Sequence, residues 1–212
     1  MAVLAGIGAI GGGVLRENEY SETGVKNLFA AGTVAGASGG GAHGFTWGCL
    51  IADHVSERVK DVKHGAFGSE QLQQIEETRK WVFTPLGRKT EYTVNPLELE
   101  DYVRNVNYNF VGLHRVRPRL ERAIELLTLA QKGAVPLLTA SNPHELMRAI
   151  EVQQIIEVSQ FHAHSALMRN ESRLVPIHYR EDYPNLDPGW DNMVVTIKKT
   201  KDRIAYQREP LN

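Results

Sequence analysis

Cysteine, net charge and long apolar runs are all scarce in this sequence of 212 residues. The single cysteine, Cys49, excludes an intrachain disulfide and suits a reducing compartment; any iron–sulfur centre would have to lie on another chain. The net charge of −1 argues against a dominant surface for nucleic acid or anionic membrane. The apolar opening, residues 1–7, is too short to span a membrane and lacks the basic start of a secretory signal. These absences predict a cytoplasmic chain with no membrane span.

The composition is that of an ordinary folded protein, with 42% apolar and 23% charged residues. It divides into two regimes. Residues 1–66 hold most of the 19 glycines, whereas the later residues have the spacing of long helices followed by a short β tail. We therefore expect an α+β fold in three parts: residues 1–66, a helical bundle over residues 67–172, and a tail with a β-hairpin over residues 173–212.

In the glycine-rich part, short apolar runs predict strands at residues 14–16 and 28–32. A glycine loop over residues 35–44 follows, and then a helix from about Thr46, its expected N-cap, to Val62. The order strand, glycine loop, helix presents backbone N–H groups at a helix N-terminus. Such a site suits a bound anion or a carbonyl oxygen.

In the second part, two Asn-Pro pairs mark helix starts. Asn95-Pro96 and Asn142-Pro143 each place an Asn N-cap before a proline at the first helical position. Pro118 should break or restart the helix before it. The expected helices are residues 69–83, 95–114, 118–133 and 143–170, packed as a bundle, and the expected hairpin strands are residues 193–198 and 203–207.

Two segments resemble one known family. Residues 23–36, TGVKNLFAAGTVAG, are similar to the second FAD motif of two-dinucleotide-binding flavoproteins, in which a Thr begins a turn and an apolar strand runs into Ala-x-Gly and a carboxylate. Residues 151–173, ending in Glu-Ser-Arg, and residues 178–184, HYREDYP, resemble the helical domain of the succinate dehydrogenase/fumarate reductase flavoproteins. L-aspartate oxidase and adenylylsulfate reductase alpha subunits share this style. Together the matches cover nearly the whole chain.

The resemblance implies an FAD-dependent oxidoreductase, of which this sequence is the carboxy-terminal portion: the end of a Rossmann-like FAD-binding domain, then the bundle and the hairpin. It implies that Gly32 and Thr33 lie at the ribitol, unless they only form a structural turn. His43 would line the flavin, transfer a proton or serve the fold, and Cys49 is a packing residue rather than a redox nucleophile. The implied cofactor-binding residues are Ala31, Gly32, Thr33, Gly44, Gly48, Cys49 and Leu50, the last three through N–H groups at a helix start facing the flavin.

The departures from the family pattern are as informative as the matches. The family's Gly-x-Gly-x-x-Gly βαβ unit, which holds the FAD pyrophosphate, has no counterpart, because residues 6–11 match only in letters. The family's substrate histidine falls on Gly8, its substrate-clamping arginine is absent near residues 46–49, and its ribitol carboxylate is Thr33. The flavin site is therefore expected to be shared with a partner chain carrying the βαβ unit. Succinate and fumarate are not expected as substrates.

Other functions fit parts of the same pattern. A degenerate, non-catalytic subunit of a redox complex would explain the lost positions, and an iron–sulfur electron-transfer subunit is a conceivable partner of either form. A hydrolase using Cys49 and His43 lacks an orienting group. His162 and His164 point about 200° apart on a helix, so no metal site is expected. Structural roles are expected for the remaining candidates: an ion-pair network anchoring the tail for Arg173, His178 and Arg180, solvated faces for the cationic runs at residues 114–117 and 198–201, and core or interface positions for Trp81 and Trp190.

Overall fold

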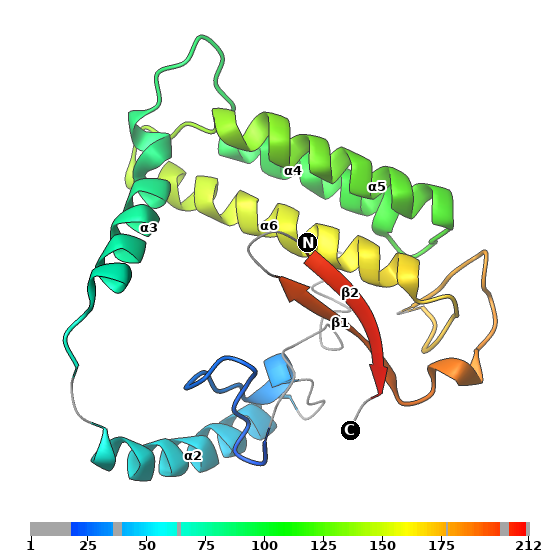
Figure 1. The fold of residues 1–212 in the computed structure, drawn as a ribbon. Coiled ribbons are helices and arrows are strands. Elements are labelled where there is room, and N and C mark those ends of the chain that lie inside the picture. The colour runs from blue at the N-terminus through cyan, green and yellow to red at the C-terminus, as the bar shows by residue number, and fades with distance from the viewer. Residues whose placement is uncertain (1–17, 36–39, 63–64, 177, 200–203, 211–212) are drawn as a thin grey trace. The chain divides into compact units, whose positions relative to one another are not determined.

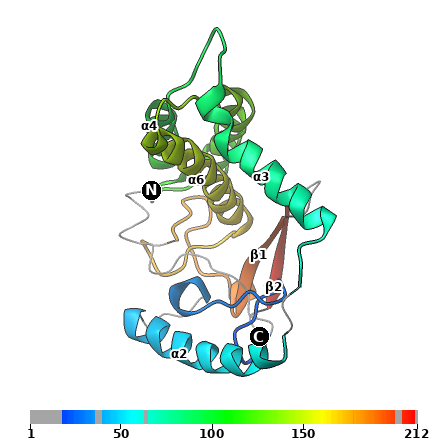
Figure 2. The ribbon, with the colours of Figure 1, turned by 90° about the vertical axis from the view of Figure 1, so that its left-hand side faces the viewer.

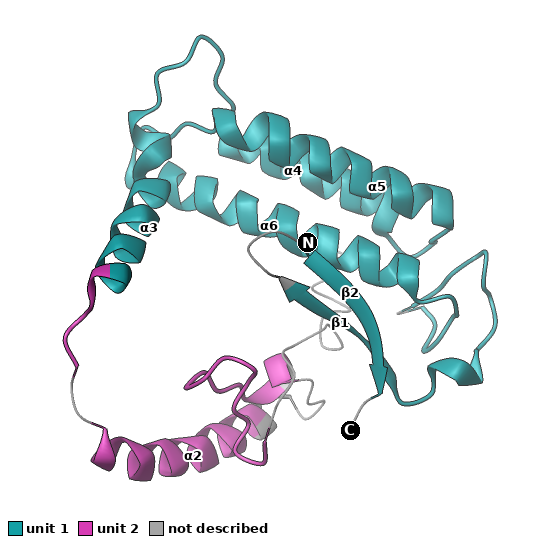
Figure 3. Ribbon diagram, in the orientation of Figure 1, with its two compact units in different colours: residues 1, 70–212 teal, residues 2–69 magenta. Residues whose placement is uncertain are grey.

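The computed structural model describes residues 18–35, 40–62, 65–176, 178–199 and 204–210. The chain forms two compact units, unit 2 over residues 2–69 and unit 1 over residues 70–212 (Figure 3). The strand expected at residues 14–16 lies outside the described residues. A separate tail from residue 173 stays a prediction. None of the described helices is long and apolar enough to cross a membrane.

Unit 2 corrects the expected strand at residues 28–32. An isolated antiparallel bridge joins Glu22 to Phe29, and Gly32–Ala35 form a short 3-10 helix, η2. The segment pairs with residues 21–23 through two backbone bonds near the bridge, and Leu28 is 51% exposed. No further strand lies beside it among the described residues of this unit. Because no second strand lies along its other edge, this apolar run cannot form the ladder of hydrogen bonds that makes a sheet.

Helix α2, Gly40–Arg58, corrects the predicted helix start. It begins six residues before Thr46, so residues 40–44 are helical rather than part of a loop. Thr46 is not an N-cap, because its hydroxyl donates to the Ala42 carbonyl one turn earlier, at 3.0 Å. A 3-10 turn, Val59–Asp61, continues the chain to the predicted end at Val62.

Unit 1 confirms the predicted helices closely. Helix α3 begins at Ser69 as expected but runs on through Pro85 to Gly87. The Asn95 side chain accepts from the Leu97 N–H at 2.9 Å and caps α4. Asn142 caps α6 in the same way, through the Glu145 N–H at 3.0 Å. The later elements are α4 (Pro96–Val106), α5 (Arg117–Leu129, with Pro118 in its first turn), α6 (Pro143–Met168), the 3-10 turns Val135–Leu137 and Pro188–Trp190, and the strands β1 (Met193–Lys199) and β2 (Ile204–Pro210).

Both α4 and α5 end in a wider, π-helical turn. These turns are Asn107–Val111 and Ala130–Ala134. A π turn bonds each N–H to the carbonyl five residues back, one residue further than in an α-helix. The predicted helix ends near residues 114 and 133 therefore include these turns.

The core lies where α4, α5 and α6 meet (Figures 1 and 2). Apolar side chains at helical spacing on all three helices are buried together, and removing such side chains from water is the main term that stabilises a bundle. One buried polar pair crosses it, in which the Asn107 amide donates to the Ser159 hydroxyl at 2.8 Å. The fully buried apolar members are Val103, Leu120, Ala123, Leu127, Ala149, Val152, Ile156 and Ala163.

The carboxy-terminal hairpin is present as predicted. Strands β1 and β2 pair antiparallel in a two-stranded sheet, from Met193 opposite Pro210 to Lys199 opposite Ile204, and β1 packs against α6. Trp190, just before β1 in the chain, is buried, and the guanidinium groups of Arg169 and Arg208 lie over its ring, at 5.1 and 4.4 Å from the ring centroid. Trp81 on α3 is 47% exposed, so it is not a core residue of the described structure.

Charged side chains anchor the tail to the end of α6. Glu171 is fully buried and accepts from the guanidinium groups of Arg169 and Arg173, at 2.8 Å from each Nε. Its second oxygen accepts from the Asp187 N–H at 3.1 Å. Burial raises the pKa of Glu171, but these hydrogen bonds, that of Arg173 first, outweigh burial and lower the pKa to about 2. Arg173 also pairs with Asp191 at 2.7 Å, so the predicted ion-pair network exists.

Replacing Glu171 by Gln should destabilise the chain strongly. The amide would leave two guanidinium groups without their buried carboxylate, and breaking such a pair typically costs about 3 kcal/mol. Urea unfolding at neutral pH, followed by circular dichroism, measures the loss. Glu125→Gln, which removes an exposed pair with Arg122, is the matched control and should change stability by less than ~0.5 kcal/mol. Equal effects of the two substitutions would contradict the anchoring role.

Candidate functional site

The FAD-motif segment begins with the turn that the resemblance implies. The Thr23 hydroxyl accepts from the Val25 N–H at 3.1 Å, and the Thr23 N–H donates to the Leu28 carbonyl at 2.8 Å. A threonine hydroxyl that binds the backbone two residues later is typical of a tight turn. The turn delivers the chain to Ala30, which is buried, and then to the glycine at position 32.

Two of the predicted cofactor-binding residues, Gly32 and Gly44, meet backbone to backbone. Gly32 has a φ of +73°, a conformation that side-chain-bearing residues rarely adopt. A Cβ at position 32 would lie 2.9 Å from the Gly44 Cα, and a Cβ at position 44 would lie 3.5 Å from the Gly32 Cα. The structure thus brings the glycine after the apolar run against the first turns of α2. The two backbones can approach this closely because neither residue has a side chain.

The other predicted site residues lie differently. Ala31 precedes Gly32 directly, Thr33 follows it within η2, and His43 belongs to the first turn of α2. Gly48, Cys49 and Leu50 are not at a helix start but in the interior of α2. There an N–H donates to the carbonyl four residues back, so these three cannot offer free N–H groups to a flavin. Cys49 and Leu50 are exposed.

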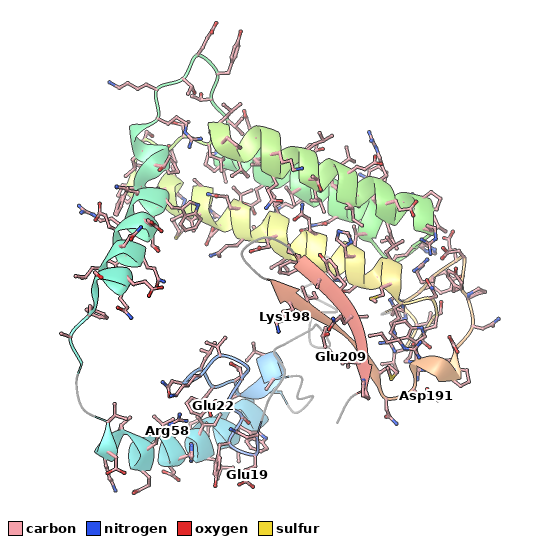
Figure 4. All side chains as sticks on the ribbon, viewed as in Figure 1. Glu19, Glu22, Arg58, Asp191, Lys198 and Glu209 are labelled. Carbon is pink, nitrogen blue, oxygen red and sulfur yellow. The ribbon has the colours of Figure 1, made fainter. Side chains whose placement is uncertain are left out.

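A small polar and aromatic cluster, which the sequence did not predict, fastens the turn to α2. Glu22 accepts from Arg58 at 3.2 Å and from the Asn27 N–H at 2.8 Å; Figure 4 shows the pair between the turn and the helix. The bond from Asn27, partly offset by burial and aided by Arg58, lowers the pKa of Glu22. The Tyr20 ring stacks on His54 at 3.8 Å between centroids. These residues are far apart in the sequence, and no local pattern links them.

In unit 1 a buried arginine lies between two histidines. Arg115 is 4% exposed, which corrects the expectation that residues 114–117 form a solvated face. Its Nη1 lies 3.0 Å from His178 Nδ1 and its Nη2 lies 3.3 Å from His162 Nε2. An arginine can only donate, so each of these histidine nitrogens accepts. His178 Nε2 then carries the proton and donates to the Arg169 carbonyl at 3.3 Å.

Burial and the charge of Arg115 together favour the neutral form of both histidines. Burial first, and then Arg115, lowers the pKa of His162 and the pKa of His178 to about 4. Burial, and then Arg180, lowers the pKa of Arg115 itself to about 10. His164 does not join this group, because its ring stacks on Tyr206 at 4.5 Å. The cluster links the segment just before α5, the later half of α6 and the tail.

Acid should loosen this cluster before it affects the carboxylates. In the unfolded chain a histidine titrates near 6.5, whereas His162 and His178 in the fold titrate near 4. The unfolded state therefore binds up to two more protons between these values, and the unfolding free energy should fall by roughly 2.7 kcal/mol, about 1.4 kcal/mol for each histidine, for each unit that the pH falls from 6.5 towards 4. Denaturant unfolding at a series of pH values measures this slope.

His162→Gln should reduce the slope, because the amide oxygen can accept from Arg115 but does not titrate. The matched control is His144→Gln, at an exposed position on the first turn of α6, which should leave the slope unchanged. A slope that His162→Gln does not alter would contradict the assignment.

Comparison with known proteins connects both units to one family. The family described as fumarate reductase flavoprotein C-term matches residues 100–212, more than half of the chain. The fumarate reductase (CoM/CoB) of Methanothermobacter marburgensis has a subunit that is 31% identical over 203 residues, which are 91% of this chain and 36% of that protein. An uncharacterized FAD-dependent oxidoreductase of Methanocaldococcus jannaschii is 28% identical over 196 residues, which are 88% of this chain and 34% of that protein.

The fold agrees with these sequence matches. The structure of adenylylsulfate reductase from Archaeoglobus fulgidus superimposes with a TM-score of 0.78 at 25% identity, over 90% of this chain and 32% of that one. This chain thus spans about a third of the length of these relatives. The matches confirm the resemblance stated from residues 23–36 and 151–184. The chain belongs to the fumarate reductase/succinate dehydrogenase flavoprotein family of FAD-dependent oxidoreductases and corresponds to its carboxy-terminal portion.

Proposed function

We propose that this chain supplies one part of an FAD site in a working oxidoreductase. The pyrophosphate of FAD would be held by a Gly-x-Gly-x-x-Gly βαβ unit on a separate polypeptide, or elsewhere in a longer protein of which these residues are a part. The observation that carries the proposal is the contact of Gly32 with Gly44. It joins the glycine of the segment that resembles an FAD motif to the first turns of α2, and it leaves no room for a side chain at position 32.

The residues of unit 2 fit this role in part. Ala31, Gly32 and Gly44 would approach the cofactor through the backbone, and Thr33 would bind a ribitol hydroxyl more weakly than the family's carboxylate does. Gly48, Cys49 and Leu50 would reach a flavin only through the exposed surface of α2, not through free N–H groups. His43 is the candidate for moving a proton. The bound isoalloxazine would supply the hydride or electron transfer.

The substrate is expected to differ from succinate and fumarate. Glycine at position 8 stands where the family has a histidine, and no arginine occupies the substrate-clamping position near residues 46–49. A dicarboxylate would therefore lack two of its charged or polar contacts. We propose a cytoplasmic complex with a complementary flavoprotein polypeptide and, where electrons travel further, an iron–sulfur subunit.

The same departures favour a second candidate, a non-catalytic subunit of a redox complex. Thr33 and Gly8 both replace groups that the family's chemistry uses, as expected of a copy kept for docking alone. The two candidates differ in flavin binding, which only the first requires.

The isolated chain should bind no stoichiometric FAD, because the pyrophosphate site is absent from its sequence. A chimera should bind it: residues 1–212 would replace the matching carboxy-terminal part of the M. marburgensis protein. In the chimera, Gly32→Ala should lower the FAD content, because its Cβ would meet the Gly44 Cα at 2.9 Å and its φ is +73°. Absorption of the purified proteins near the flavin bands measures the bound FAD.

Gly65→Ala is the matched control, since a Cβ at position 65 meets nothing within 4 Å. It should leave the FAD content of the chimera unchanged. A folded chimera without FAD would favour the docking role, and equal FAD content in the two alanine variants would remove Gly32 from the site.

Restoring the family's acidic group should strengthen cofactor binding. Thr33→Glu in the chimera is expected to lower the Kd for FAD about tenfold, the gain of a charge-assisted over a neutral hydrogen bond. Equilibrium titration of the apo chimera with FAD measures the change, and Thr33→Gln serves as the uncharged control. An affinity that the glutamate lowers or leaves alone would place position 33 away from the ribitol.

A further inference from the structure

Helix α3 is joined to the bundle at its end only. Of its residues Ser69–Gly87, Pro85 alone is buried. The Pro85 carbonyl accepts from the Ala140 N–H at 3.0 Å, and Arg88 donates to the Pro136 carbonyl. Figures 1 and 2 show the rest of the helix running away from the bundle. Most of α3 therefore has no packing partner within unit 1.

One side of α3 is apolar at regular spacing. Leu72, Ile75, Val82 and Leu86 are separated by three, seven and four residues, and Arg79 occupies the remaining position of this pattern. This is the a/d spacing of a two-stranded coiled coil over two heptads. Leu72 and Ile75 are each more than half exposed, as is Phe83 at the flank. Such a seam fits another helix better than it fits a flat surface.

The charges of α3 are divided between its two halves. The amino-terminal half carries Glu70, Glu76 and Glu77, whereas the carboxy-terminal half carries Arg79 and Lys80. Arg79 lies on the apolar seam and Glu76 lies beside it, and the two side chains form an ion pair at 3.6 Å. Both side chains are more than half exposed. The seam is thus acidic just before its centre and basic at its centre, whereas residues 81–87 carry no charge.

We propose that α3 binds α3 of a second copy of this chain, antiparallel, through this seam. In that arrangement each Arg79 lies beside the partner's Glu76 at the centre of the seam. A parallel pair would instead place the two Arg79 side chains together. The pattern is complementary to itself under a two-fold axis, as an interface between identical copies requires.

The length of the seam sets the strength of the pair. Two heptads bury less than the roughly 1,200 Å² of a stable standard-size interface. The dimer is therefore reversible, and the monomer dominates at low concentration. Because the charges flank a short apolar strip, they decide both the orientation and much of the affinity.

Sedimentation velocity of the full chain, from micromolar to near-millimolar concentration, tests the proposal. The unaltered chain should shift from monomer to dimer. Arg79→Glu should raise the dimer dissociation constant about tenfold or more, because four acidic groups then meet at the centre. The combined variant Glu76→Arg with Arg79→Glu should restore dimerisation, because it exchanges the two charges without changing their complementarity.

Lys80→Glu is the matched control. It makes the same charge change one residue along, at a position that faces away from the seam, and should leave the dissociation constant within about twofold. Helical circular dichroism of each variant establishes that it is folded. A chain that stays monomeric at every concentration would overturn the proposal. So would equal effects of Arg79→Glu and Lys80→Glu, or a charge exchange that fails to restore the dimer, which would assign the seam to a different partner.

Discussion

The end of α6 is the point at which the bundle and the tail become one structure. The last carbonyls of a helix have no donors within it. Here the fully buried Arg180 provides them, because its Nη1 donates to the carbonyls of Ala166, Leu167 and Arg169. Its other nitrogens bind both oxygens of Asp182 at 2.7 and 2.8 Å. A guanidinium can be buried at this depth only because every side of it is hydrogen-bonded.

The need to hydrogen-bond the buried Arg180 also fixes the groups around it. Asp182 also accepts from the Arg117 N–H at 2.9 Å, so the start of α5 is held by the same carboxylate. The bonds from Arg180 outweigh burial and lower the pKa of Asp182. The Ser172 hydroxyl accepts from the Arg180 N–H and donates to the Tyr183 carbonyl, which closes the loop between them. These hydrogen bonds thus fix the course of the chain that leads into the hairpin.

The sequence predicted best the features that neighbouring residues decide. Asn95 and Asn142 each bind an N–H two or three residues away, so both helix starts were correct. The run at residues 28–32 failed for the opposite reason, because a strand exists only where another strand lies beside it. The start of α2 was misplaced because Thr46 resembles a cap, whereas Gly40 carries no cap signal.

The same distinction between features set by neighbouring residues and features set by distant ones applies to the candidate site. Gly32 was named from the FAD motif and Gly44 from the glycine-rich segment after it, and the structure brings their backbones together. Gly48, Cys49 and Leu50 were expected to expose N–H groups at a helix start. The structure places that start at Gly40, so these three residues lie inside the helix instead. Arg115 and Arg117 belong to one cationic run, yet one is buried and the other exposed, and only the packing of His162 and His178 distinguishes them.

The π-helical turn Asn107–Val111 explains how Arg115 comes to face the interior. Along α4 one face is buried, at Leu99, Val103 and Val106. Within the π turn Asn107 and Val111 are buried as well, and the Val111 carbonyl accepts from Arg115 Nε at 3.0 Å. One extra residue in a turn changes the direction of the next side chains by about 100°. The geometry of one turn thus reaches the histidine cluster, because the carbonyl at its end holds the arginine that donates to both histidines.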